Sequence, residues 1–209
     1  MEKLAKKEIT DYFRSNIFES ILAYSAWKMI LGSRSTGMIS ADMVERYVKI
    51  QKYHPDFFLS TERAFLFQFV IQVLHSFDPR TDSASLYKVD KDETEKFVLE
   101  NRKVINALRD VRNKIFAHRD IKASQEKLND FKIPSMNDLD QFFKNLIIFY
   151  NSLTNTIDGS STMFNNAYEI KHDIENLFMN IQRGETVRKE EIDLKWMWLE
   201  NNKKASDLL

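Results

Sequence analysis

The sequence contains no cysteine, so disulfide bonds and thiolate metal sites are excluded. It also has only four glycines and three prolines in 209 residues. Because these two residue types make tight turns and interrupt regular structure, their scarcity favours long helices joined by few loops. The chain has neither a glycine-rich phosphate loop nor a His-Glu-x-x-His zinc motif, which removes two common kinds of catalytic site.

An excess of charge of one sign is also missing, since lysine plus arginine and aspartate plus glutamate both total 31. No global positive field steers the chain to nucleic acid, so any contact with RNA must use a local basic patch. The first residues carry charges without an apolar stretch behind them, unlike a secretory signal. The most apolar run, 64–74, is too short to span a bilayer. We therefore expect a cytoplasmic protein with no membrane partner.

Apolar residues recur at helical spacing along the chain, and no stretch alternates as a strand does. The composition is 43 % hydrophobic and includes 16 phenylalanines, enough for one well-buried domain with an appendage. The predicted fold is all-α, a four-helix bundle core with additional N-terminal and C-terminal helices. The helices are expected over about 3–31, 40–53, 56–77, 90–118 and 135–158, followed by one ending near Gly184 and a last one carrying Trp196 and Trp198.

The run Asp158-Gly159-Ser160-Ser161 is the clearest boundary signal in the chain. We therefore predict a helical domain over 1–158 and a C-terminal helical extension over 159–209 packed on the same domain. Trp196 and Trp198 could anchor a partner or dock the last helix onto the bundle. Docking is favoured, because aromatic side chains are first of all core material.

One stretch, Arg109 to Asp120, combines basic residues with a histidine at the end of the expected 90–118 helix. Its seam of apolar residues recurs at i, i+4, i+7 and i+11 and comprises Val104, Leu108, Val111 and Ile115. His118 falls on the same seam and Arg112 on the neighbouring row, so both flank the surface through which this helix packs. The guanidinium there requires an anionic partner, which is either a phosphate or a carboxylate such as Asp110 or Glu93.

Two other groups of polar residues have structural explanations. The remaining histidines, at 54, 75 and 172, are too scattered to form a metal set, and no metal or cofactor is expected. His75 ends an apolar helix and is interpreted as a satisfied core or cap residue. Asp90-x-Asp92-x-Thr94 resembles the signature of haloacid-dehalogenase phosphatases, but that motif follows a buried parallel strand. Acidic residues in the first turn of a helix explain it better.

Arg112-Asn113, followed by four residues and His118, resembles the Arg-polar-x-His signature of the HEPN superfamily, whose active members are metal-independent ribonucleases. The flanking Leu108–Val111 and Arg119-Asp120 are most similar to the abortive-infection, AbiU-type branch. The similarity covers about 10–155. It implies an endoribonuclease that acts in prokaryotic phage defence or in a toxin–antitoxin system, where a second protein would neutralise it. Some HEPN toxins are modified on a tyrosine two residues after the motif histidine, but Asp120 stands there in this chain.

The six-residue spacing makes the side chains of Arg112 and His118 diverge by roughly 120° around a straight helix. The resemblance implies a homodimer in which two motif helices meet and form a composite site. In such a site His118 would transfer protons, with an unperturbed pKa of about 6.5, and Arg112 would stabilise the charge on the phosphorane. Asn113 would orient the phosphate or the ring. Contacts to the RNA backbone are assigned to Arg109, Lys114, Arg119 and Lys122.

Two alternatives stay open at this level. The first is a HEPN-like helical module that binds RNA, nucleotide or protein without cutting anything, in keeping with the zero net charge. The second is a structural helical bundle in which Arg112 forms a salt bridge and His118 belongs to the core.

Overall fold

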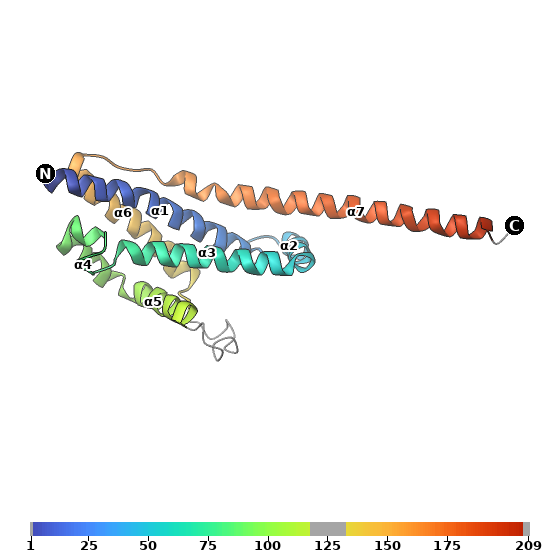
Figure 1. Ribbon diagram of the computed structural model, residues 1–209, viewed down its shortest axis with the longest axis horizontal. Helices are drawn as coiled ribbons and strands as arrows, with labels where there is room; N and C mark the ends of the chain where they lie inside the picture. The colour runs from blue at the N-terminus through green and yellow to red at the C-terminus, as the bar shows by residue number, and fades with distance from the viewer. Residues whose placement is uncertain (1, 118–132, 207–209) are drawn as a thin grey trace.

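The computed structural model describes residues 2–117 and 133–206. In this part of the chain there are seven α-helices, two short 3-10 helices and no strand, so the predicted all-α class is confirmed (Figure 1). In chain order the elements are α1 (Glu2–Gly32), α2 (Ala41–Tyr53), α3 (Pro55–Ser76), η1 (Leu86–Lys88), α4 (Lys91–Glu100), α5 (Arg102–Ala117), α6 (Met136–Asp158), η3 (Asn165–Tyr168) and α7 (Ile170–Ser206).

Local sequence signals set several helix ends where they were expected. The side chain of Ser40 caps α2 by accepting from the backbone N–H of Met43, and Pro55 starts α3, where its missing N–H is no loss. Ser135 caps α6 by accepting from the backbone N–H of Asp138 at 3.1 Å. Gly159 ends α6 with φ +74°, a conformation that favours glycine.

The core is built around the pair α1 and α3, which lie side by side over most of their length (Figure 1). Side chains from α1, α3, α4, α5 and α6 form one large buried cluster. Tyr24 of α1 and Phe143 of α6 stack within it, with ring centroids 4.6 Å apart. A second cluster joins α2 to the first part of α7, where Tyr47 and Phe178 stack at 4.4 Å. These two clusters fix the outer helices to the central pair.

Helix α3 is the most apolar element of the described chain. By length and composition it qualifies as a membrane span, which corrects the inference drawn from the shorter run 64–74. The core helix of a soluble protein passes the same test, and α3 buries one side of its surface in this bundle. Its buried residues are Phe58, Leu66, Phe69, Val70, Val73, Leu74 and Ser76.

The expected 90–118 helix is divided into α4 and α5 at Asn101. The amide side chain of Asn101 donates to the carbonyl of Phe97 at 2.9 Å, and its own carbonyl accepts the first bond of α5, from Ile105 at 3.1 Å. An asparagine that competes for backbone partners in this way favours a helix end. The apolar periodicity of the sequence continues across Asn101, so the periodicity alone could not reveal this helix break.

In the C-terminal region, two expected helices form a single one. Instead of ending near Gly184, α7 runs unbroken through it for 37 residues. Its first part follows α1, and its second part extends beyond the bundle (Figure 1). Trp196 is 63 % and Trp198 65 % exposed, so the favoured interpretation that they dock the helix on the bundle is wrong. The domain boundary at residue 158 stays a prediction.

Candidate functional site

The motif helix α5 is held in place by one buried face. Val104, Ile105, Leu108 and Val111 belong to the large core cluster, and α5 contacts α3, α4 and α6. These contacts follow from the i, i+4, i+7 seam seen in the sequence. The opposite face of α5 is solvated, on the far side of the α1–α3 pair from α7 (Figure 1).

Arg112 lies on the solvated side of α5 rather than in the packing surface. Its Nε and one terminal nitrogen donate to Oδ1 of the adjacent Asn113, at 3.3 and 3.1 Å. Within the described residues it forms no ion pair with a carboxylate. The expectation that packing forces an anionic partner on Arg112 is therefore corrected, since water solvates an exposed guanidinium. The amide oxygen of Asn113 instead holds the guanidinium in one orientation.

The rival explanation of Arg112 as one member of a salt bridge finds no support in the described part of the chain. Glu93 pairs with Lys96 at 3.9 Å instead. Asp110 is exposed and forms no ion pair there. Neither of the two carboxylates considered from the sequence is thus the partner of Arg112.

Arg109 lies one turn before Arg112 and is half-buried. One of its terminal nitrogens donates to the side-chain oxygen of Asn106 at 3.2 Å, so an arginine–asparagine pair occurs twice along α5. Burial raises the pKa of Tyr87 in η1, and the positive charge of Arg109 partly opposes this effect. Arg109 is therefore close enough to η1 for its charge to act on the phenol.

The ammonium of Lys103, which is also on α5, already forms an ion pair within the fold. Lys103 pairs with Asp138 of α6 at 3.1 Å. Hydrogen bonding from Ser135 and then from Lys103 lowers the pKa of the Asp138 carboxyl. Arg102, at the start of α5, is exposed and has no carboxylate partner among the described residues. In the described part of the chain, the three arginines of α5 thus have no carboxylate partner, whereas Lys103 has one.

The remaining predicted site residues cannot be placed. His118, Arg119 and Lys122 lie outside the described residues, as does the rest of the charged stretch up to residue 132. Lys114 belongs to α5, but its side chain is also outside the described part. The structure therefore brings together Arg109, Arg112 and Asn113 on one helix and leaves the position of His118 as a prediction.

The two motifs interpreted as structural are confirmed as such. Asp90 caps α4 by accepting from the backbone N–H of Glu93 at 3.1 Å, and the buried hydroxyl of Thr94 donates to backbone carbonyls of Leu86 and Asp90. His75 is half-buried, and its Nδ1 lies 3.3 Å from the amide nitrogen of Asn16. Asp90, Thr94 and His75 are thus all engaged within the fold.

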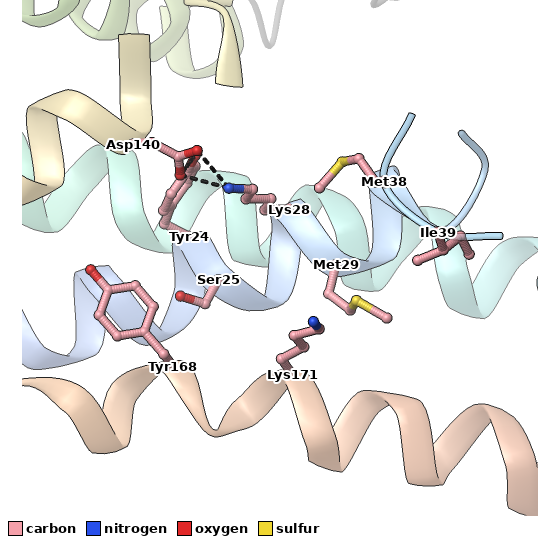
Figure 2. A pocket seen from close by; sticks show the side chains of 10 residues that line it. Tyr24, Ser25, Lys28, Met29, Met38, Ile39, Asp140, Tyr168 and Lys171 are labelled. Carbon is pink, nitrogen blue, oxygen red and sulfur yellow. Dashed lines mark hydrogen bonds and ion pairs between the residues drawn. The ribbon is translucent and has the colours of Figure 1, made fainter. Parts of the chain in front are cut away.

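A polar group that the sequence did not single out lies at the junction of α1, α6 and α7 (Figure 2). Lys28 donates to both carboxylate oxygens of Asp140, at 2.7 and 2.6 Å, and the hydroxyl of Tyr24 donates to Oδ1 at 2.8 Å. These residues come from helices more than a hundred positions apart, so spacing gave no signal. Lys28 is the one charged residue of α1 after Glu19, and this was the one hint.

The all-α architecture, the buried seam and the exposed arginine on α5 are consistent with a helical domain of the HEPN class. The sequence model of AbiU2, a HEPN family of abortive infection, matches residues 5–178. The chain therefore belongs to this family, as the motif predicted, and to proteins of abortive-infection phage defence. No curated protein and no solved structure matches the chain significantly.

Proposed function

We propose that this protein is a metal-independent endoribonuclease of the HEPN type that acts in abortive infection. The observation that carries the proposal is the exposure of Arg112 together with the contacts that its guanidinium makes. It is exposed, oriented by Asn113 and without a carboxylate partner among the described residues. A guanidinium held in this way is prepared to bind a phosphate, because it is permanently charged and presents a planar fork of donors.

The chemistry assigned to the site needs the 2′-hydroxyl of RNA. The 2′-oxygen attacks the adjacent phosphorus, and its proton passes to a base. The bond from phosphorus to the 5′-oxygen then breaks, and the leaving alkoxide takes up a proton. The products are a 2′,3′-cyclic phosphate and a 5′-hydroxyl. His118 is the proposed proton carrier, and Arg112 the group that stabilises the phosphorane.

A second copy of the chain completes the proposed site. The six-residue spacing would make Arg112 and His118 diverge around a single straight helix, whereas a two-fold axis beside α5 would present both residues twice to one cleft. Arg109 and Lys114 of α5, with Arg119 and Lys122 beyond it, are the proposed contacts to the RNA backbone. An active ribonuclease in the cytoplasm would require control, so we also propose a neutralising partner protein.

The test is cleavage of end-labelled single-stranded RNA by the purified chain in EDTA. We expect fragments that end in 2′,3′-cyclic phosphate, and no cleavage of DNA of the same sequence. Arg112→Ala and His118→Ala should each lower the cleavage rate by at least about 10²-fold while circular dichroism and thermal unfolding stay unchanged. Arg80→Ala is the matched control, since this exposed arginine already pairs with Asp78 at 2.7 Å.

Two results would overturn the proposal. Cleavage that EDTA abolishes would assign the reaction to a metal-dependent nuclease. Intact RNA that nevertheless binds the chain in a salt-sensitive way would instead support the alternative, a HEPN module that binds RNA without cutting it.

A further inference from the structure

A cavity of about 280 Å³ lies between α1, α6 and the start of α7, away from the motif helix. Its walls are Tyr24, Ser25, Lys28, Met29, Gly32, Met38, Ile39, Asp140, Tyr168 and Lys171 (Figure 2). No residue of α5 lines it. Ligand pockets in proteins start at about 300 Å³, so this volume suits a small molecule rather than a dinucleotide or a peptide.

The charges that line the cavity do not cancel. Asp140 is fully engaged by Lys28 and Tyr24, which leaves the ammonium of Lys171 in excess. Lys171 extends from α7 toward α1 and into the space between them (Figure 2). Its ion pair in the described chain is a long contact of 3.8 Å with Glu175, made by an ammonium whose side chain is 58 % exposed, and such pairs contribute little. The cavity therefore has a net positive charge that a ligand could neutralise.

The cavity also offers hydroxyl donors. The phenol of Tyr168 points toward α1 (Figure 2) and has no hydrogen-bond partner among the described residues. Burial, and then the negative charge of Asp140, raises its pKa. This phenol therefore stays protonated at neutral pH and can donate to an anion together with Lys171.

The other end of the cavity is apolar. Met29, Met38 and Ile39 line it, and Met38 lies directly over the Cα of Gly32, where any side chain would collide with its sulfur. Methionine thioethers are polarizable and pack favourably against flat rings. A ligand that carries an anionic group and a flat ring would satisfy both ends.

We propose that this cavity binds a small phosphate monoester carrying a flat ring, with the phosphate on Lys171 and Tyr168 and the ring against the methionines. A phosphate monoester presents three strong acceptor oxygens, so it can accept from Lys171 and Tyr168 at the same time. The proposal does not depend on RNA cleavage, because the cavity and the motif helix share no residue.

The experiment is isothermal titration of the full chain with adenosine monophosphate, inorganic phosphate and adenosine in separate runs. We expect one site per chain for the monophosphate and at least tenfold weaker binding of the other two compounds. Lys171→Ala and Tyr168→Phe should each weaken the monophosphate by about tenfold, the loss typical of one charge-assisted hydrogen bond. Lys91→Ala on α4 is the matched control, an exposed lysine outside the cavity.

Each other outcome overturns part or all of the proposal. No binding of the monophosphate to the wild-type chain removes the site. Equal affinity for adenosine removes the anion contact, and equal affinity for inorganic phosphate removes the ring contact. Unchanged affinity in folded Lys171→Ala places the ligand elsewhere. Thermal unfolding of each variant verifies that the cavity walls are intact.

Discussion

The arginines in the described part of the chain fall into two groups, those that pair with a carboxylate and those that do not. In the bundle and along its flanks, arginines pair with carboxylates, as in Arg34 with Glu62 at 2.8 Å and Arg80 with Asp78 at 2.7 Å. On α5, Arg102, Arg109 and Arg112 have no carboxylate partner among the described residues, and two of them contact asparagine amides instead. Arg63 of α3 and Arg183 of α7 share this state, but neither has a second such arginine on its helix.

The difference separates two uses of the same side chain. A guanidinium that is neutralised within the fold can contribute to stability but has little left to offer a ligand. A guanidinium held by a neutral amide keeps its full charge and a fixed direction. The comparison therefore predicts that the first group affects unfolding and the second affects RNA.

The largest expected effect concerns Arg112. Its replacement by alanine removes the group that stabilises the transition-state charge, so the cleavage rate should fall by about 10²–10³-fold. The free energy of unfolding should change by less than about 0.5 kcal/mol, as for other exposed positions. Single-turnover cleavage and urea unfolding on the same preparation measure both quantities. A destabilised variant would assign Arg112 to the paired group after all.

Arg34→Ala should behave in the reverse way. Arg34 bonds to Gln51 and forms an ion pair with Glu62, whose side chain is 19 % exposed. Losing hydrogen bonds to a charged group that remains partly buried should lower the free energy of unfolding by about 2 kcal/mol. Arg46→Ala is the control, because its exposed pair with Asp42, one turn away, is worth only about 0.3–0.5 kcal/mol. RNA cleavage should be unchanged in both folded variants.

Acid should destabilise the fold by protonating carboxylates that pair with arginine or lysine. Hydrogen bonding from Arg80 lowers the pKa of Asp78 from 3.8 to about 2, and the pKa values of Asp138 and Asp158 are lowered as well. A carboxyl with a depressed pKa stabilises the folded state above its unfolded pKa, and that contribution is lost as the pH falls through the folded value. The free energy of unfolding should therefore drop from about pH 4 to about pH 2.

The control for this pH effect is Asp78→Asn, followed by urea unfolding at several pH values. The variant should be less stable than the wild type at neutral pH, and the difference should shrink as the pH falls toward 2. A constant difference at all pH values would show that the Asp78 carboxylate does not carry the effect.

The sequence predicted the helices and the motif far better than it predicted the surroundings of either. Apolar periodicity located α1, α2, α3 and α6 because each helix buries one side and ends at a recognisable cap or proline. It could not detect the break at Asn101, where one side chain competes for backbone partners within a continuous apolar pattern. Nor could it detect that α7 continues past the bundle, because exposed and buried tryptophans look alike in a sequence.

The candidate site could likewise be predicted only where it depends on local sequence. The motif identified Arg112 and Asn113 and the family, since that information is local. The exposure of Arg112 depends on how far α5 projects past its neighbours, and a helical wheel contains no such information. The cavity around Asp140 needs contacts between α1, α6 and α7, so it was beyond the reach of spacing arguments.

The smallest effect is expected for Arg109, and it tests the comparison by salt dependence. If Arg109 contacts one phosphate of a single-stranded RNA, Arg109→Gln should weaken binding only severalfold and equally for all sequences. The slope of the logarithm of affinity against the logarithm of salt concentration should become shallower by about 0.7, since about 0.7 counterions are released per phosphate of a single strand. Fluorescence anisotropy at several salt concentrations, with the catalytic variant His118→Ala to keep the RNA intact, gives both numbers. Arg80→Gln should leave the slope unchanged, because the guanidinium of Arg80 already donates to both carboxylate oxygens of Asp78. Equal slopes for the two variants would show that a guanidinium without a carboxylate partner has no special access to RNA, and the division between the two groups of arginines would lose its functional meaning.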